Sequence, residues 1–431
     1  MNGRKKICLK VAGLGCIVSI IVFYPELAFS QNNQDLRKEI EVLKQRITHL
    51  EEKLAVQEKI SKQEAGNTEN SDKIQEALSG ISIQAGATFI IQGVHNANGD
   101  NLSANGEDVT DGSYSADITL EKKLGDYDKA FIHLETGSGA GVEDELAVFS
   151  NVNQDANDSD DQISVTEIWV EHYFSNAPLI LTFGKFDPAG YIDTNEYAND
   201  ECTQFLGHIF KKSPAIEFPD NSMGLRLNLK PAGFADVDFV VMDADSDWED
   251  IFDDVFIAAQ INFKPAIVSR TGNYRLLGWI NNRDHTKWLD IAKNEERNYG
   301  FGISCDQKLT DNIGLFLRYA WQNPEVYLNG EDFSLEQSWS AGLQLSGGLW
   351  RRNDDVFGLA FGQVFPSDDY KNAQDVKAES EEHLEVYYNF KINDHLTVSP
   401  DVQVIWDSYG CDAVNGDRTI VVGGLRTQVD F

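Results

Sequence analysis

The residues of this chain that could do chemistry are charged and amide side chains at alternate positions of apolar segments. Arg226 stands between Leu225 and Leu227, and Arg318 follows Leu317. Successive side chains of a strand point to opposite faces, so polar residues gather on one face and apolar residues on the other. Carboxylates, guanidinium groups and amides there could exchange hydrogen bonds with polar solutes. The candidates for this polar inner face are Arg226, Arg318, Glu385, Asp401, Gln403 and Arg426.

An acidic segment invites a calcium interpretation but lacks the full pattern. Asp243, Asp245 and Asp247 stand at positions one, three and five of an EF-hand-like loop. Position six is Trp248, where the loop requires glycine, and position twelve is Asp254 rather than glutamate. The segment is therefore expected to be a charged surface loop.

Other catalytic and cofactor motifs are absent or incomplete. The glycine-rich residues 137–141 are not followed by Lys-Ser or Lys-Thr, so they do not form a phosphate-binding loop. The histidines show no zinc-type spacing, and no serine stands in a context that singles out a His and an acid. We therefore expect no metal, no cofactor and no catalytic residues.

The elements that must position the polar face are many short strands. Residues 237, 239 and 241 are apolar and alternate with Asp236 and Asp238, and similar runs recur at 257–263, 313–321, 339–345, 384–390 and 396–406. The last residues, 419–431, also alternate and end on Phe431, which is typical of the closing strand of an outer-membrane barrel. At roughly 20 to 25 residues per strand and connection, residues 81–431 predict an all-β, antiparallel transmembrane β-barrel of about 16 strands.

The N-terminal 80 residues have a different organisation. Four basic residues precede an apolar run at 11–24, and Ala28-Phe29-Ser30 fits a signal-peptidase site, so residues 1–30 are predicted to be a signal peptide. The alternative is a membrane anchor, for which the run is short. Leucines and isoleucines at heptad spacing predict a short α-helical coiled coil in the periplasm at 31–60, with a lone amphipathic helix as the alternative. Residues 61–80 are expected to be a linker.

Charge and cysteine content limit the partners. The formal net charge of -34 argues against nucleic acid, because a phosphate polymer would be repelled. It suits a solvated lumen and acidic outer loops, for which 151–161 and 243–254 are candidates. Beyond the signal peptide the chain has Cys202, Cys305 and Cys411, without metal-type spacing. A Cys202–Cys411 disulfide is possible, but the sequence does not establish it.

Two blocks of sequence resemble the carbohydrate-selective porin (OprB-type) family. The first comprises residues 184–187, 193–200, 203–206 and 214–221, and the second comprises 384–390, 396–403 and 423–431. The resemblance covers most of residues 81–431 but not the predicted coiled coil. Cys202 and the pair Lys211-Lys212 lie inside the first block without a family role to assign.

The resemblance implies passive diffusion of sugars or similar small polar solutes through a 16-stranded barrel. We expect this barrel to lie in the outer membrane of a Gram-negative bacterium, surrounded by outer-membrane lipid. The short coiled coil needs partner helices nearby, which a homotrimer would supply. Residues expected to form or brace a constriction are Lys185, Asp187, Asp193, Asn195 and Glu217. The alternative for each lumen or constriction residue is a solvated wall position or a hydrogen bond to a packed loop. Trp169, Trp279, Trp339 and Trp406 could stack on sugars, although barrel aromatics more often belong to interfacial girdles.

Two other functions remain open. A channel for cations or metal complexes, such as siderophores, is favoured by the net acidity, which concentrates positive charge at a pore mouth. A surface-binding protein could also use the barrel only as an anchor, in which case the pore would be closed to ions.

Overall fold

The structure is a computed structural model that describes residues 80–99, 107–157, 159–251, 253–267, 269–411 and 419–431, together with Lys44, Thr48 and Lys53. Those three residues are helical and exposed. The predicted signal peptide at 1–30, coiled coil at 31–60 and linker at 61–80 otherwise lie outside the described residues. The barrel unit comprises Gly80–Phe431.

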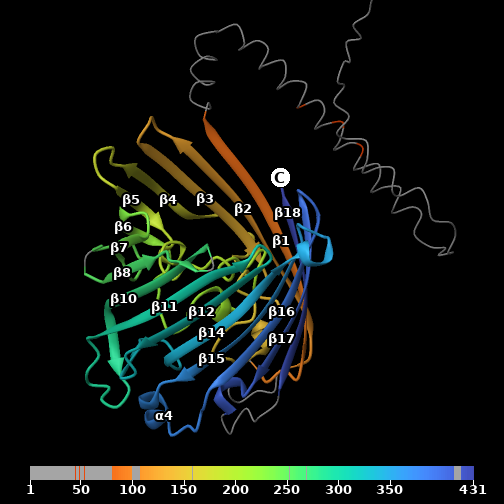
Figure 1. Ribbon diagram of the computed structural model, residues 1–431. Coiled ribbons are helices and arrows are strands. Elements are labelled where there is room, and N and C mark those ends of the chain that lie inside the picture. The colour runs from red at the N-terminus through yellow and green to blue at the C-terminus, as the bar shows by residue number, and fades with distance from the viewer. Residues whose placement is uncertain are drawn as a thin grey trace, which may run out of the picture. The chain divides into compact units, whose positions relative to one another are not determined.

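The barrel unit is a single antiparallel sheet that closes on itself (Figure 1). β1 pairs with β2 and also with β18, with Gly86 opposite Asp430 and His95 opposite Val421. The sheet has eighteen strands in the described residues, and removing the short strands β9 and β13 leaves sixteen in the wall. The prediction of about 16 strands is therefore confirmed. The wall strands are β1 (Ile81–His95), β2 (Thr110–Lys123), β3 (Asp128–Ser138), β4 (Ser164–Tyr173), β5 (Leu179–Phe186), β6 (Ser222–Ala232), β7 (Ala235–Asp243), β8 (Val255–Phe263), β10 (Arg270–Lys287), β11 (Glu296–Thr310), β12 (Ile313–Gln322), β14 (Leu335–Ser346), β15 (Val356–Pro366), β16 (Glu381–Asn393), β17 (Leu396–Trp406) and β18 (Ile420–Asp430).

The remaining elements are small and lie in the connections. β9 (Ala266–Ile267) and β13 (Val326–Leu328) add short pairings to β10. α3 (His208–Lys211) lies in the β5–β6 loop and α4 (Asp368–Gln374) in the β15–β16 loop. None of the helices among the described residues is long and apolar enough to cross a membrane.

The connections differ strongly between the two ends of the barrel. At the end where β1 begins and β18 ends, the connections are tight, as at residues 124–127, 233–234, 311–312 and 394–395. At the other end they include two long loops, residues 139–163 between β3 and β4 and residues 187–221 between β5 and β6. Short periplasmic turns and longer outer loops are typical of outer-membrane barrels, so the tight end is the periplasmic end.

The outward face of the wall is apolar. On β8, Ile257, Ile261 and Phe263 are exposed, while the intervening Gln260 and Asn262 are buried. The same alternation exposes Leu315 and Leu317 on either side of the buried Phe316 on β12. Exposed apolar side chains in register around a closed barrel form the band that contacts lipid.

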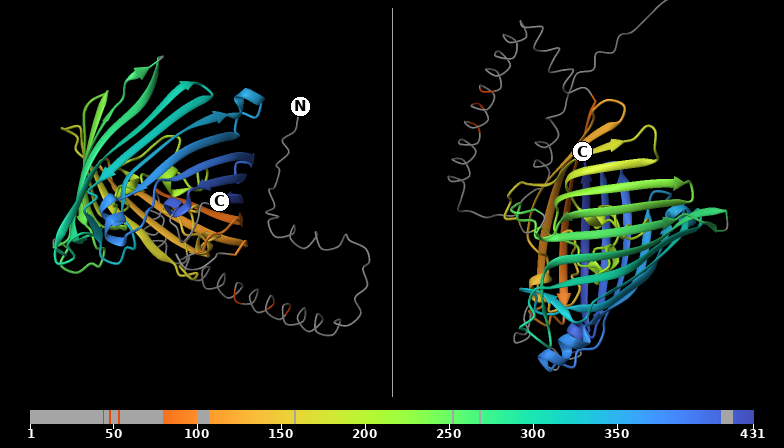
Figure 2. Two further views of the ribbon diagram at one scale, coloured as in Figure 1. Left: turned by 90° about the horizontal axis from the view of Figure 1, so that it is seen from below. Right: turned by 90° about the vertical axis from the view of Figure 1, so that its left-hand side faces the viewer.

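The two long loops fold into the barrel (Figure 2) and create its core. Phe205, Ile209 and Phe210 of the β5–β6 loop belong to a buried cluster with wall residues such as Phe316 and Ala360. Glycines on the wall leave space for this packing. A Cβ on Gly314 would lie 2.2 Å from the ring of Tyr197, and one on Gly362 would lie 2.8 Å from the side chain of Ile209.

The β3–β4 loop departs from the sequence expectation. Residues 151–161 were expected to form an acidic outer loop, but Val152, Asn153 and Asp155 are buried. Ser115 on β2 donates to both carboxylate oxygens of Asp155 at 3.1 Å, and Val152 packs in a cluster with Val422 and Ile420 of β18. Part of this acidic segment therefore lines the inside of the barrel.

Candidate functional site: the loop-narrowed lumen

Arg318 on β12 organises one end of the β5–β6 loop. Its guanidinium group donates to the backbone oxygens of Ala198, Phe210 and Asp193, and it forms an ion pair with the Asp193 carboxylate at 3.3 Å. Only 1% of Arg318 is exposed. The planar guanidinium group can satisfy several carbonyls at once, so one side chain fixes three points of the loop.

Asp193 and Asn195 fix the same loop from its own side. The backbone N–H of Asp193 donates to Gln260 on β8 at 3.0 Å, and its carboxylate accepts from the Ser213 N–H at 2.8 Å. Burial raises the pKa of Asp193, against the opposing effect of Arg318. The Asn195 amide donates to Ser304 and to the Cys305 carbonyl of β11.

A second group of wall residues holds the middle of the loop. Glu385 on β16 accepts from the backbone N–H groups of Leu206 and Gly207 at 2.6 and 2.8 Å. Arg426 on β18 donates to the backbone oxygens of Glu201 and Gln204. Both side chains are almost fully buried. These contacts match the loop-packing alternative considered for each candidate.

Gln403 and Asp401 on β17 extend this anchoring to the β3–β4 loop. Gln403 donates to the Val152 carbonyl at 2.7 Å and to Asp401 at 3.2 Å. Both residues face inward and are buried.

The other predicted constriction residues are dispersed. Glu217 accepts from His285 at 2.9 Å, Asn281 at 2.6 Å and Asn298 at 2.9 Å, near the outer ends of β10 and β11. Asp187 begins the β5–β6 loop and accepts from the Ala189 N–H at 2.8 Å. Lys185 pairs with Ile168, an exposed apolar residue on the outward face, so the structure does not bring Lys185 together with the inward-facing candidates.

Arg226 lies on a different part of the inner wall, where only 11% of its side chain is exposed. Its guanidinium group contacts Asp238 at 2.7 Å and Glu171 at 3.5 Å, and it lies over the Tyr191 ring at 4.2 Å. Like the other candidates on the wall strands apart from Lys185, it faces inward, but its partners are wall carboxylates and an aromatic face rather than loop carbonyls.

Partly exposed charged side chains lie on the inner faces of β2, β3 and β4 and on the β5–β6 loop, and we take the space between them as the candidate narrow passage. On the wall, Asp117 bonds His133 at 2.7 Å, and Glu167 lies 4.0 Å from the other ring nitrogen of His133. On the loop, Lys211 forms an ion pair with Glu201, and both side chains are about one-fifth exposed. Glu135 on β3 lies opposite Asp117 on the same face, and the charge of Glu201 repels its carboxylate. These groups face the remaining space from both sides.

Two neighbouring lysines of the β5–β6 loop have pKa values shifted in opposite directions. Burial opposes the charge of Lys211, but the neighbouring Glu201 outweighs it and raises the pKa of Lys211. Burial, together with repulsion from Lys211, lowers the pKa of Lys212. The loop therefore presents one firmly held ammonium group beside a second that loses its proton more easily.

An aromatic and charged track continues from this constriction toward the periplasmic end. Phe131 and Trp169 stack at 4.8 Å between ring centroids, and Lys129 lies 4.9 Å from the centre of the Trp169 ring. Lys129 also contacts Glu171 at 3.7 Å. The register places Glu121, Phe131 and Trp169 side by side across three strands.

Most inward residues of β3 are absent from the lumen candidates predicted from the sequence. Lys129, Phe131, His133 and Glu135 alternate with Ala130, Ile132 and Leu134 on β3, so the same two-residue period could have identified them. Of the four tryptophans considered for sugar stacking, the registers place Trp169 and Trp279 on the inward face and Trp339 and Trp406 on the outward face. Trp169 and Trp279 are both buried.

Potential metal ligands and thiols can be located in the described part of the chain. There, no group of three or more His, Cys, Asp or Glu residues is arranged to hold a metal ion. Cys202 is a free thiol that donates to Asp155 at 3.4 Å, so the disulfide left open by the sequence is not formed. Burial raises the pKa of Cys202 well above its usual value, which disfavours the reactive thiolate.

A closed sixteen-strand barrel with an apolar outer band, tight turns at one end and two inward-folded loops defines an outer-membrane porin. The profile of the carbohydrate-selective porin, OprB family, matches residues 104–431. The chain belongs to this family.

Two solved structures share the barrel fold, and one further protein is similar to part of this chain. The high-pH structure of Pseudomonas putida OprB superimposes with a TM-score of 0.67 at 15% identity, covering 85% of this chain and 97% of that one. The outer-membrane channel DcaP of Acinetobacter baumannii gives 0.51 at 13% identity, covering 81% and 97%. An uncharacterised Aquifex aeolicus protein is 26% identical over 224 residues, which are 52% of this chain and 58% of that protein. At these identities the two structures support the fold alone.

Proposed function

We propose that this protein is a porin of the outer membrane that lets small neutral carbohydrates diffuse passively through its lumen. The observation that carries the proposal is the composition of the track below the constriction. Lys129, about one-fifth exposed, lies there over the Trp169 ring, Arg226 lies over the Tyr191 ring, and Glu171 contacts both cations. Paired charges of both signs exchange hydrogen bonds with hydroxyl groups, and aromatic faces contact the C–H face of a sugar ring.

Liposome swelling tests this function. Purified, refolded protein is reconstituted, and the swelling rate is measured with neutral sugars of increasing size and with zwitterionic amino acids of matched size. Faster entry of sugars than of matched amino acids supports the proposal. Equal rates would support a general channel, and no swelling would support a barrel that serves only as an anchor.

A cation channel is the second candidate, because carboxylates dominate the narrow passage. Asp117, Glu135, Glu167 and Glu201 face it, with Lys211, Lys212 and His133 as the neighbouring basic groups. A carboxylate-lined narrow section concentrates cations. The reversal potential in a potassium chloride gradient separates the candidates, since strong cation selectivity without sugar uptake would favour this one.

We also propose that residues 1–30 are removed on export and that the coiled coil at 31–60 lies in the periplasm of a homotrimer. The heptad spacing supports this arrangement, because so short a seam needs partner helices held nearby. Sedimentation of detergent-solubilised protein with and without residues 31–60 tests it. A full-length monomer would contradict the trimer, and a trimer unaffected by the deletion would leave the coiled coil without this role.

A further inference from the structure

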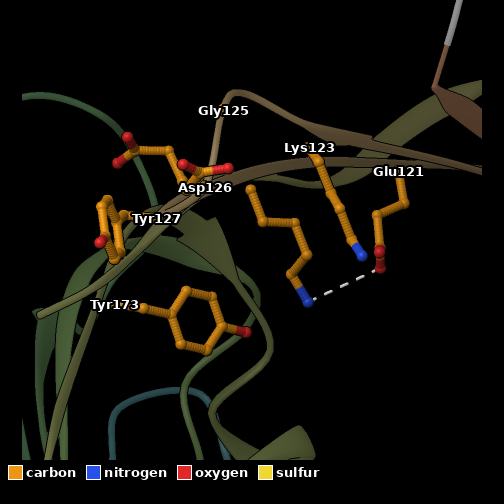
Figure 3. A pocket seen from close by; sticks show the side chains of 8 residues that line it. Glu121, Lys123, Gly125, Asp126, Tyr127 and Tyr173 are labelled. Carbon is orange, nitrogen blue, oxygen red and sulfur yellow. Dashed lines mark ion pairs between the residues drawn. The ribbon is translucent and has the colours of Figure 1, made fainter. Parts of the chain in front are cut away.

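A pocket at the periplasmic end of the barrel is lined by residues that the sequence analysis did not select. It lies at the tight turn between β2 and β3 and at the end of β4 (Figure 3). The rings of Tyr127 and Tyr173 lie on one side of it, and Glu121 and Lys123 lie on the other. The pocket is at the foot of the aromatic and charged track.

The orientation of Tyr173 is not that of a membrane-girdle aromatic. Tyr173 follows the inward-facing residues Trp169 and Glu171 at two-residue spacing, while His172 and Phe174 point outward and pack edge to face at 4.5 Å. Phe174 therefore supplies the aromatic residue on the outward face at this level of the wall. Yet 40% of Tyr173 is exposed, which leaves an apolar ring surface in the water of the lumen.

Contacts among its own residues hold the pocket in one arrangement. The Tyr173 hydroxyl donates to Glu171, which fixes the direction of the ring, and the Tyr173 N–H donates to the Tyr127 carbonyl at 2.7 Å. Lys129 is shared between Glu121 at 3.6 Å and Glu171 at 3.7 Å. A pre-formed site loses little freedom on binding, which favours weak and reversible capture of a small solute.

The charges of the pocket select a neutral ligand. Lys123 and Lys129 stand beside Glu121 and Asp126, while Asp128 bonds the outward-facing His172 at 2.7 Å, so the lining carries both signs in equal number. A strongly charged solute of either sign would meet repulsion as well as attraction. A polyhydroxylated ring would instead find donors, acceptors and two aromatic surfaces, of which Tyr127 is 48% exposed.

We propose that this pocket is a second sugar-binding site, which holds a neutral carbohydrate at the periplasmic exit of the lumen with Tyr173 as the stacking surface. The proposal rests on the proposed sugar permeation but assigns a separate site to it. A weak exit site allows a sugar to leave the narrow passage in two steps rather than one, as multi-site pores require.

Ion-current block in planar bilayers tests the site. The protein is inserted from one chamber so that its orientation is uniform, and maltose is added to either chamber while the current is recorded. We expect Tyr173→Ala to weaken the block by added maltose about three- to tenfold, mainly through faster release and mainly from the periplasmic chamber. Tyr173→Phe keeps the ring and is expected to retain most of the block. Tyr127→Ala, which lies in a turn outside the strands, is a second variant in case Tyr173→Ala does not assemble.

The matched control is Tyr299→Ala, because Tyr299 on β11 is 46% exposed but faces outward beside Trp321. An equal maltose block in Tyr173→Ala, Tyr127→Ala and Tyr299→Ala would overturn the exit site while leaving sugar permeation intact. If sugars cause swelling but maltose does not block the unmodified channel, the exit site is likewise overturned and sugar permeation is left intact. Absence of both swelling and block would instead remove the proposed function together with the site. Tighter block by gluconate than by maltose would overturn the choice of a neutral ligand.

Discussion

The two sides of the barrel interior use the same sequence pattern for different purposes. On the side formed by β10 to β18, the inward polar residues are buried against the two long loops, as Arg318, Glu385 and Arg426 show. On the side formed by β2 to β6, several inward charged residues pair with one another and remain about one-fifth exposed, as Lys129 and His133 show. The comparison teaches that alternation identifies an inward residue, whereas the loops decide whether it is an anchor or a lining group.

The largest effect is expected from removing the central anchor. Arg318→Met leaves the buried Asp193 carboxylate and three loop carbonyls without their donor, which costs about 3–5 kcal/mol of folding free energy. Urea unfolding of the refolded barrel measures this, and single-channel conductance reports whether the loop leaves the lumen. Lys185→Met, which removes an outward-facing cation, is the control. Equal stability of the two variants would contradict the anchoring role.

A smaller loss is expected at the second anchor. Glu385→Gln retains one oxygen acceptor but places an amide donor against a backbone N–H, so either Leu206 or Gly207 loses its partner. An unsatisfied buried donor costs about 1–3 kcal/mol. The measurement is again the urea midpoint. A neutral outcome would mean that the middle of the loop is held by Arg426 and apolar packing alone.

The loop-packed side should also respond to pH through the β3–β4 loop. Burial raises the pKa of Asp155 to about 7 and that of Glu143 to about 7. An acid whose pKa is higher in the folded state binds more protons there than in the unfolded state, so stability falls as pH rises between about 4 and 7. Asp155→Asn is expected to reduce the fall in stability with rising pH. The part of the fall that persists in this variant is due to Glu143. Unfolding midpoints at pH 4.5 and 7.5 check it, and an unchanged slope would contradict the assignment.

The open side should change selectivity with little change in stability. Lys211→Ala removes the ammonium group beside Glu201 and leaves Glu135 and Glu167 less compensated, so the reversal potential should move toward greater cation selectivity. Glu135→Gln should move it the opposite way. Both shifts should shrink at high salt, because screening shortens the range of these charges. Shifts of the same sign would show that the two residues do not share one passage.

The outward position of Lys185 gives the smallest expected effect. Its Nζ donates to the Val165 carbonyl at 2.8 Å near the outer end of the wall. Lys185→Gln should therefore leave both the conductance and the reversal potential unchanged. A clear change in selectivity would show that Lys185 acts at the pore mouth after all.

The sequence by itself determined the barrel and the face of most wall residues. Two-residue alternation follows from strand geometry alone, so Arg226, Arg318, Glu385, Asp401, Gln403 and Arg426 could each be assigned a side from their neighbours. The strand number followed from length, because each strand and its connection have a limited size. Lys185 was selected from a motif without applying the alternation, and its register with Ile168 puts it on the outward face.

Only the tertiary structure decided which inward residues line a passage. The β5–β6 loop has no periodic pattern that predicts its path, and its position depends on contacts between residues far apart in sequence, such as Arg318 with Ala198 and Glu385 with Leu206. The same holds for the exit pocket, where a turn residue, Tyr127, meets the end of β4. Strand geometry is local and can be derived from the chain, whereas loop placement depends on packing across the closed barrel.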